Sequence, residues 1–413
     1  RAIFASHLRL SGCGGFPMHC NNSLGSMRSM ALRVLFAAAS VCSSMRSHAV
    51  RFRQMDLSIS SESLGFSPRH IVVLGAGVLS GHMSRTPEGS MMTAGPVEMP
   101  KPWSNHLTDI TVLGQGDFAT VLRASLQGDG SRHVVVKHFR LWNDEAISFA
   151  QREIDVLSEL QGAPGIVQYH GSWATADMQP DSDVYILLES AVGDMGDLVI
   201  GRTLDEVDLA TRLRLFADVL RAVEGLGQRG IVHRDLKPEN ILIVGNGSTA
   251  LRDCNAVICD FGCASTGLDL QWSPGLAAGT ARYLPPEAWM FSMASPAQDM
   301  WALGLVFFQL LVGVLPVPLA DLDDPAKIRQ VVCSSFRIHD SPEYWTLHED
   351  MPELAQLLRR MLAPDPTMRI TPEAALEELE TFAKHHSLNI APVGRMATPR
   401  SDLLFEGQMA QLN

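Results

Sequence analysis

The spacing of hydrophobic residues changes near the middle of the chain. Five short runs of alternating or apolar residues predict strands at 110–113, 121–124, 133–138, 167–171 and 184–189. A longer run predicts a helix over 145–160. Further on, apolar residues fall three or four positions apart and line one helical face, at Leu213, Phe216, Leu220, Val223 and Leu226. A strand-rich stretch followed by a helix-rich stretch predicts an α+β fold of two lobes.

The longest run without a charge, WALGLVFFQLLVGVLPVPLA at 301–320, approaches the length that spans a bilayer. Three features argue against a membrane helix. Pro316 and Pro318 break the end of the run and Gln309 lies inside it, while no basic cluster flanks either side. We therefore expect a buried helix in a large lobe, and no transmembrane segment in the folded domain.

Composition fits a globular protein of 413 residues with 46% hydrophobic content. The net charge of −12 is unevenly distributed, because residues 1–100 hold nine Arg and four acids while most acidic residues follow. An acidic main body argues against general nucleic-acid binding. The seven cysteines are scattered and favour reduced thiols, although Cys259 and Cys263 lie close enough for a metal pair to be conceivable. Oligomeric state is left open.

Residues 1–55 contain seven Arg, nine Ser and no acid, a bias that resembles an organelle transit peptide. Within them, 30–45 has the outline of a secretory signal, and a disordered extension without an addressing role is equally compatible. We expect cytoplasmic localisation by default, with organelle import as the alternative. Residues 56–106 are expected to form a poorly ordered linker. Its run IVVLGAGVLSG (71–81) imitates a dinucleotide-binding turn without the strands that must follow.

The octapeptide HRDLKPEN at 233–240 places an acid, a cation and an amide where a phosphoryl group could be moved. Asp235 can accept a proton from an attacking hydroxyl, Lys237 can neutralise charge on the transferring phosphate, and Asn240 can ligate magnesium. The string resembles the catalytic loop of eukaryotic Ser/Thr protein kinases. Several other motifs of that family occur along the chain in the expected order.

One of these motifs, LGQGDFATV, resembles the glycine-rich loop that covers the phosphates of ATP. The chain departs from the family pattern by having Ala119 at the third glycine position, which predicts a slightly stiffer loop. Phe118 at the tip is expected to cover the phosphates. The nucleotide contacts that the resemblance implies here are Leu113, Gly114, Gly116, Phe118 and Val121.

A second group of motifs supplies charged residues. In VVVK, strand alternation lets the Lys137 ammonium emerge from an apolar strand, where it needs a partner. The motif REIDVL resembles the family's helix C and offers Glu153 as that partner. VICDFG resembles the magnesium-binding segment, with Asp260 on the metal and Phe261 packed against His233. The surplus residues between the catalytic loop and this segment predict a lengthened hairpin turn.

Later motifs imply structural contacts. In GTARYLPPE (279–287), Thr280 is expected to hydrogen-bond both charged residues of the catalytic loop, a pattern typical of Ser/Thr kinases. Glu287 is expected to pair with Arg369, and Asp299 to brace the catalytic loop from below. The resemblance covers 107–383.

The resemblance implies a two-lobed kinase fold, with a small β-rich lobe over 107–189 and a large helical lobe over 192–383, followed by a tail at 384–413. It implies ATP and Mg²⁺ as cofactors, with Asn240 and Asp260 on the metal, and a protein substrate. Catalytic roles fall to Asp235, Lys237, Lys137, Glu153 and Thr280. The adenine is expected to meet Val135, Leu188, Glu189, Ala191 and Leu242.

Three further expectations concern function. The first is transfer of the γ-phosphoryl group of ATP to Ser or Thr, with a pseudokinase that binds nucleotide without transfer as the alternative. The second is a preference for basic residues before the acceptor, because Glu239 and Asp197 match carboxylates that face a substrate arginine. The third is regulation through Arg234, which would meet a phosphate on the activation segment 263–278. Among Ser265, Thr266 and Ser273, we favour Ser273 as the acceptor.

Overall fold

The computed structural model describes residues 99, 101–116, 118–175, 178–201, 206–245, 250–267, 279–290, 294–317, 319–334 and 336–394. Several predictions therefore lie outside the described residues. These are the targeting segment 1–55, the glycine-containing run 71–81, most of the predicted linker, Ser273 in the activation segment, and the end of the predicted tail.

The first lobe is built on a five-stranded antiparallel sheet, ordered β1-β2-β3-β5-β4. The strands are β1 (Leu107–Gln115), β2 (Ala119–Leu126), β3 (Asp129–Arg140), β4 (Tyr169–Ala174) and β5 (Asp183–Glu189). Strand β3 is central, and the β-branched run 134–136 suits a strand paired on both sides. Its Lys137 lies opposite Val121 on β2 and Ile186 on β5. The lysine is thus held at the middle of the sheet.

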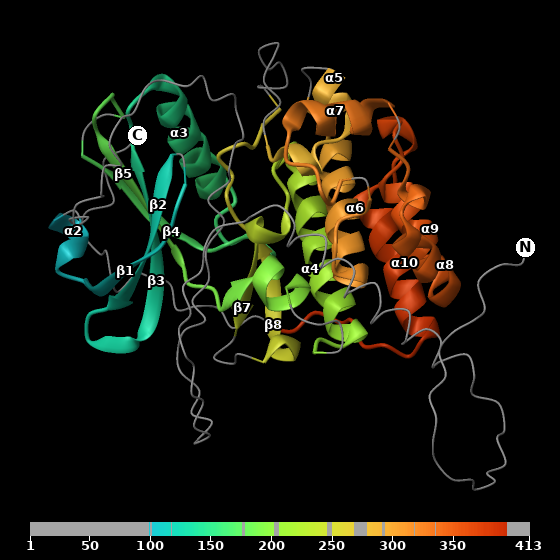
Figure 1. Ribbon diagram of the computed structural model, residues 1–413. Helices are drawn as coiled ribbons and strands as arrows, with labels where there is room; N and C mark the ends of the chain where they lie inside the picture. Colours follow the sequence, from blue (N-terminus) through green and yellow to red (C-terminus); the bar gives the residue numbers. More distant parts are fainter. Residues whose placement is uncertain are drawn as a thin grey trace, which may run out of the picture. The chain divides into compact units, whose positions relative to one another are not determined.

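Helix α3 (Asp144–Glu159) lies beside this sheet (Figure 1). Its start is fixed by Asn143, whose side-chain oxygen accepts a hydrogen bond from the Ala146 N–H at 2.8 Å. The helix buries Ala146, Ala150, Glu153, Val156 and Leu157, which share one face. Glu153 is the charged member of that buried set, so the helix carries its carboxylate inward.

The other face of the sheet is covered by residues from before β1. A short helix, α2 (Lys101–Ser104), brings Trp103 against Tyr185, with ring centroids 6.4 Å apart in an edge-to-face arrangement. Trp103 and Met99 are buried in a cluster with residues of β2, β3 and β5. The last residues of the predicted linker, 101–106, are therefore part of the folded lobe. Their apolar side chains are few, and for that reason the segment resembled a linker.

The second lobe is mainly helical and contains a small sheet of β6 (Gly193–Asp194), β7 (Ile241–Gly245) and β8 (Cys254–Ile258). Its α-helices are α4 (Leu209–Gln228), α5 (Pro286–Met290), α6 (Pro296–Val312), α7 (Pro325–Ser334), α8 (Pro342–Asp350), α9 (Pro352–Met361) and α10 (Pro372–His385). Short helical turns connect them at η1 (Gly196–Ile200), η2 (Pro238–Asn240), η3 (Leu251–Asp253), η4 (Ala281–Tyr283), η5 (Ile338–Asp340) and η6 (Pro366–Met368). The lengthened hairpin predicted after the catalytic loop is the β7–β8 pair, which closes at Gly245 and Cys254.

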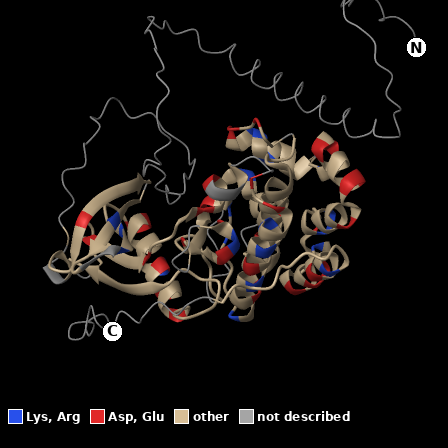
Figure 2. Ribbon diagram, turned by 90° about the horizontal axis from the view of Figure 1, so that it is seen from below, with Lys and Arg blue, Asp and Glu red and all other residues tan. Residues whose placement is uncertain are grey.

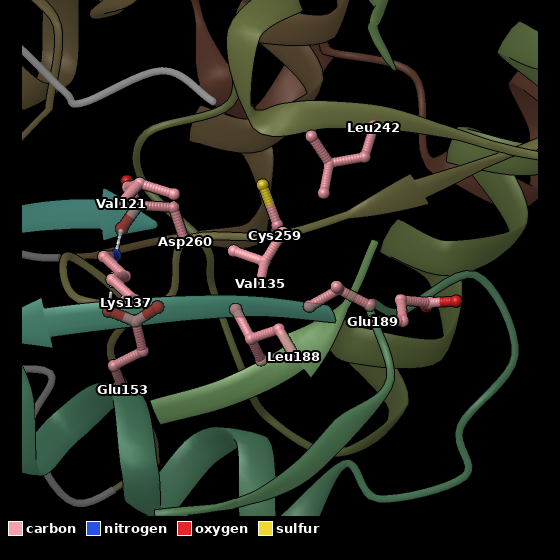
Figure 3. Close-up of a pocket in the computed structure, with 10 residues that line it drawn as sticks. Val121, Val135, Lys137, Glu153, Leu188, Glu189, Leu242, Cys259 and Asp260 are labelled. Atoms are coloured by element: carbon pink, nitrogen blue, oxygen red, sulfur yellow. Dashed lines mark hydrogen bonds and ion pairs between the residues drawn. The ribbon is translucent and has the colours of Figure 1, made fainter. Parts of the chain in front are cut away.

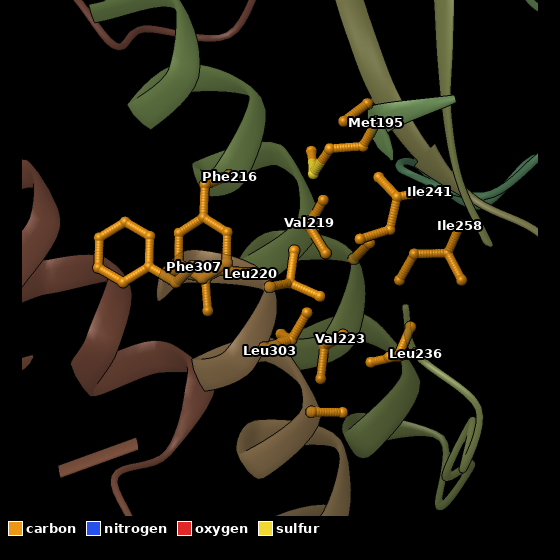
Figure 4. Close-up of a cluster of buried hydrophobic side chains, with 14 of the residues drawn as sticks. Met195, Phe216, Val219, Leu220, Val223, Leu236, Ile241, Ile258, Leu303 and Phe307 are labelled. Carbon is orange, nitrogen blue, oxygen red and sulfur yellow. The ribbon is translucent and has the colours of Figure 1, made fainter. Parts of the chain in front are cut away.

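The core of this lobe lies where α4 packs on α6 (Figure 4). The rings of Phe216 and Phe307 stack with centroids 4.3 Å apart, and Leu220 and Leu303 are fully buried beside them. Helix α6 contains most of the long uncharged run and ends at Gly313, whose φ of 91° suits a residue without a side chain. The predicted buried helix is thus present. Among the described residues, no helix is long and apolar enough to cross a membrane.

The described chain continues past the predicted boundary at 383. Ile390 is buried in the core of the helical lobe, and the Asn255 side-chain amide donates to the Val393 carbonyl at 2.9 Å. The first part of the predicted tail is therefore tied to β8. Acidic segments occur in both lobes with basic segments scattered among them (Figure 2), as the composition indicated.

Candidate active site

A pocket is lined by residues of both lobes and carries a charged end (Figure 3). Its lining consists of Val121, Val135, Lys137, Glu153, Val167, Leu188, Glu189, Leu242, Cys259 and Asp260. Aliphatic side chains form the walls, while an ammonium and two carboxylates gather at one end. An apolar slot that ends in charges suits a ligand with a flat ring and an anionic tail. Seven of these residues were expected to bind a nucleotide or its metal. The other residues with that expectation are not in the lining: Leu113, Gly114, Gly116, Phe118, Ala191 and Asn240.

The charged end is organised around Lys137. Its ammonium lies 2.6 Å from Glu153 Oε2 and 2.9 Å from Asp260 Oδ1, so the predicted pairing with Glu153 is present and a second carboxylate joins it. Burial by itself lowers the pKa of Lys137, but Asp260 and Glu153 outweigh burial and hold the pKa above its ordinary value. Burial raises the pKa of Glu153 against the opposing pull of Lys137. The lysine is therefore charged at every physiological pH.

Around Asp235, three neighbours fix the orientation of the carboxylate. Oδ1 accepts from the Thr280 backbone N–H at 2.7 Å and from its hydroxyl at 2.8 Å. Oδ2 accepts from the Lys237 ammonium at 3.0 Å and from the Asn240 amide at 3.1 Å. Lys237 also donates to the Thr280 hydroxyl at 2.9 Å, as the sequence predicted. Lys237 and Asn240 are buried and Thr280 is partly buried, which favours one fixed arrangement.

The backbone of the catalytic loop is held by Asp299 at the start of α6. Its two carboxylate oxygens accept from the backbone N–H groups of His233 and Arg234 at 2.8 and 2.9 Å. Arg234 has a φ of 71°, which a side chain makes unfavourable, so the two bonds from Asp299 compensate local strain. Burial raises the pKa of Asp299 in spite of them. The His233 ring meets Phe261 edge-on at 4.9 Å, which joins the loop to the segment that carries Asp260.

The residues expected to hold magnesium fit such an ion. The Asn240 amide is fixed because its nitrogen donates to the Asp235 carbonyl at 2.7 Å, while its buried Oδ1 has no hydrogen-bond partner among the described residues. An amide oxygen and the Asp260 carboxylate are ligands that Mg²⁺ accepts. Burial raises the pKa of Asp260, but Lys137 outweighs it, so the group is ionised.

The cysteines beside Asp260 behave as buried thiols. Burial raises the pKa values of Cys259 and Cys263 above the ordinary thiol value. No cluster of three or more His, Cys, Asp or Glu in the described part of the chain could hold a metal ion. Cys259 and Val167 line the pocket although sequence reasoning did not select them. The position of Cys259 directly before Asp260 was the available signal.

The glycine-rich segment forms the turn between β1 and β2. Gly114 pairs with Val121 across the two strands, and the Gly116 N–H donates to the Ala119 carbonyl at 2.8 Å. The Phe118 ring stacks on Phe149 of α3, with centroids 4.6 Å apart and planes 18° from parallel. The ring thus lies against α3, outside the residues that line the pocket. Phe149 belongs to none of the motifs of the sequence analysis.

Away from the pocket, Glu287 and Arg369 form a second buried ion pair. Two guanidinium nitrogens reach the two carboxylate oxygens at 2.5 and 3.1 Å, and the remaining donors bind the carbonyls of Ala297 and Ala363. The guanidinium also lies over the Trp301 ring, 5.2 Å from its centroid. This predicted pair is therefore present and fully hydrogen-bonded.

Comparison with known proteins decides the family. Residues 107–379 match the model of the protein kinase domain. This chain is a member of the protein kinase family. Its kinase domain belongs among the eukaryotic Ser/Thr kinases, a family that uses ATP and Mg²⁺ and acts on proteins.

The kinase domain is similar to several curated relatives. Calcium/calmodulin-dependent protein kinase type 1B of Rattus norvegicus is 34% identical over 275 residues, which cover 65% of this chain and 72% of the relative. Death-associated protein kinase dapk-1 of Caenorhabditis elegans is 33% identical over 217 residues, or 50% of this chain and 14% of the relative. Serine/threonine-protein kinase dkf-1 of Caenorhabditis briggsae is 29% identical over 276 residues, or 66% and 34%. Their names differ, and the subfamily is unresolved.

Proposed function

We propose that this kinase domain is catalytically active and transfers the γ-phosphoryl group of ATP to Ser or Thr hydroxyls of protein substrates. The observation that carries the proposal is the arrangement around Asp235. Its carboxylate is held by Thr280, Lys237 and Asn240, next to the fixed Lys137–Asp260 pair. Positioning and charge stabilisation supply most of the catalysis in this chemistry, so a preorganised set of charges is what it requires.

In this proposal, ATP places its adenine between Val135 and Leu242, in front of Leu188, with hydrogen bonds to the backbone at Glu189 and Ala191. Figure 3 shows the Glu189 carboxylate turned away from the charged end. The carboxylate accepts from the Gln168 N–H at 2.6 Å, and the Glu189 N–H donates to the Gln168 carbonyl at 3.0 Å.

The phosphates extend toward the charged end of the pocket. Lys137 holds the α- and β-phosphates, and the backbone of the glycine-rich turn at Gly114 and Gly116 approaches them closely because no side chain intervenes. Asn240 and Asp260 hold Mg²⁺, which when bound neutralises charge on the phosphate oxygens.

Asp235 acts on the acceptor. The substrate hydroxyl donates its hydrogen to the Asp235 carboxylate and attacks the γ-phosphorus as the bond to the ADP oxygen breaks. Lys237 stabilises the charge on the transferring group. Burial lowers the pKa of Lys237, but Asp235 and Asp260 outweigh it and raise the pKa, so the ammonium is charged when transfer occurs.

The competing hypothesis is a pseudokinase that binds nucleotide without transfer. The presence of every charged group that transfer needs argues against it. We expect Asp235→Asn to lower phosphorylation of a generic basic protein by at least about 10³-fold while ATP binding persists. Asp253→Asn, on the surface turn η3, serves as the matched control and should keep wild-type activity. A wild-type protein that binds ATP and transfers no phosphate would establish the pseudokinase.

We further propose that substrates carry basic residues before the acceptor. Asp197 and Glu239 are exposed and lie close to the buried Asp194. Burial, together with the nearby charges of Asp197 and Glu239, raises the pKa of Asp194 to about 6. Three neighbouring acids suit a guanidinium. The test compares phosphorylation of peptides with and without Arg before the acceptor. The double variant Asp197→Asn with Glu239→Gln should lose the preference for the Arg-containing peptide and phosphorylate the Arg-free peptide as the wild type does.

We also propose control through Arg234, with a phosphate on the activation segment as its ligand and Ser273 as the acceptor. Burial and the nearby Arg152 charge lower the pKa of Arg234, against the opposing effects of Cys263 and Asp299. Two neighbouring cations would suit a phosphate. Ser273→Ala should reduce activity, and unchanged activity would refute the choice of Ser273.

A further inference from the structure

Phe149 of α3 lies between two elements that handle phosphate in the proposed function. On one side its ring stacks on Phe118 at the tip of the glycine-rich turn, with centroids 4.6 Å apart. On the other side it reaches Gly262, the residue after the Asp260–Phe261 pair. A Cβ atom added to Gly262 would lie 2.9 Å from Phe149 Cδ1, closer than side chains pack. The ring therefore fills the space between the turn and the magnesium-binding segment.

The position of Phe149 along α3 connects it to the third such element. Glu153, which holds Lys137, lies four residues later and so occupies the same helical face one turn on. The ring and the carboxylate move together if the helix moves. The aromatic contact extends outward to the exposed Trp142, whose ring is 6.3 Å from Phe118 and nearly parallel to it.

The contact between Phe149 and Gly262 requires a residue without a side chain at position 262. Gly262 does not adopt the left-handed backbone conformation that would by itself require glycine. Its other neighbours, Asp260 Oδ1 and Glu153 Oε2, would be 3.7 and 3.8 Å from the added Cβ, an ordinary contact distance. The Phe149 ring is thus the group that excludes a side chain at this position.

We propose that Phe149 is a positioning residue that joins the tip of the glycine-rich turn, Glu153 and the Asp260 segment into one unit. This inference rests on the proposed function of the pocket. A turn containing Gly114 and Gly116 has many accessible conformations, so an aromatic anchor at its tip reduces the entropy lost when it closes over phosphates. Because the same ring contacts Gly262, a shift of α3 displaces both phosphate-binding elements together.

A double-mutant cycle tests the inference. Phe118→Ala and Phe149→Ala should each weaken binding of ATP–Mg²⁺ and raise KM for ATP by about 2- to 10-fold, which corresponds to one aromatic pair. The double variant should be no worse than the more severe single variant, and KM for the peptide should stay unchanged. Phe149→Tyr should retain wild-type values because it keeps the ring.

Ile154→Ala is the matched control, since Ile154 lies on the same helix and packs against the core. It should lower the melting temperature and leave KM for ATP unchanged. Additive effects of Phe118→Ala and Phe149→Ala, or an equal KM change in Ile154→Ala, would show that Phe149 only stabilises the fold and would overturn the proposal.

Gly262→Ala gives an independent reading. It should weaken ATP–Mg²⁺ binding, and adding Phe149→Ala should restore part of the affinity because the added methyl group then has room. If the affinity for ATP–Mg²⁺ does not recover, the proposed packing of Phe149 against Gly262 is wrong. Because ATP binding is measured directly, a protein that shows both couplings but transfers no phosphate would refute the proposed activity and leave this inference standing.

Discussion

The two buried ion pairs of this kinase domain differ in how completely they are satisfied. Arg369 uses its donors on both oxygens of Glu287 and on backbone carbonyls, so its guanidinium is fully used and each carboxylate oxygen has a partner. Lys137 is shared between Glu153 and Asp260, and the buried Glu153 Oε1 has no partner among the described residues. The first pair fixes a structure, whereas the second leaves unsatisfied charge facing a pocket.

This difference follows from the chemistry of the two cations. A guanidinium is planar and binds a carboxylate through two parallel bonds, which suits a permanent contact. An ammonium is a compact point charge that can exchange one oxygen for another, as the phosphates of ATP would require. Burying an incompletely paired carboxylate costs stability. At Glu153 we attribute this cost to ligand binding, because functional sites often hold such groups.

The largest effect should come from Lys137→Met. We expect the rate of phosphate transfer to fall by at least about 10³-fold, because the phosphates lose their cation and Glu153 loses its partner. The melting temperature should fall less than in a variant that breaks the Glu287–Arg369 pair, because the pKa of Glu153 is already raised to about 7 and the unpaired carboxylate can take up a proton. Kinetic assays combined with thermal melting check both statements. A large loss of stability would mean that this pair is as structural as Glu287–Arg369.

Breaking the satisfied pair should act on stability. Arg369→Met leaves Glu287 charged and buried, so the free energy of unfolding should fall by about 3–5 kcal/mol. Arg360→Met removes the surface pair between Arg360 and Glu378 and is the matched control, with an expected loss below about 1 kcal/mol. Urea unfolding of both variants measures the difference. Equal losses of unfolding free energy would show that the Glu287–Arg369 pair stabilises the domain no more than a surface pair does.

The smallest effect concerns pH. Burial raises the pKa of Glu153 above its unfolded value, so the folded state binds the extra proton more readily and this group's contribution to stability decreases as pH rises through neutrality. Glu153→Gln removes that penalty. Relative to wild type, its free energy of unfolding should gain roughly 2 kcal/mol between about pH 5 and 8, although its activity falls. Melting curves at the two pH values test this.

Glu287→Gln provides the contrast at the other pair. It leaves Arg369 with a neutral partner, so it should destabilise the domain at both pH values. A Glu153→Gln variant that is destabilised in the same way would show that the two pairs do not differ in kind.

Much of the site could be predicted because the decisive residues lie in short motifs whose geometry is local. Strand alternation placed Lys137 on the face opposite Val136, and the catalytic loop brought Asp235, Lys237 and Asn240 together within a few residues. The contacts of Thr280 and Asp299 followed from resemblance, and the structure contains them.

What the sequence did not reveal depends on packing between distant segments. Phe149 has no motif of its own, and its importance comes from contacts with Phe118 and Gly262, which only the folded chain brings together. The same holds for Asn255 and Val393, which tie the tail to β8. Helix α2 was missed because four residues carry almost no periodic signal.

Helix α2 also bears on how a shortened version of this protein would behave in solution. A polypeptide started at Leu107, where the family match begins, would lack Trp103 and Met99 and would leave Tyr185 and its apolar neighbours open to water. A bare apolar face on a β-sheet favours self-association. Soluble material for binding or kinetic work should therefore retain the chain from before Met99.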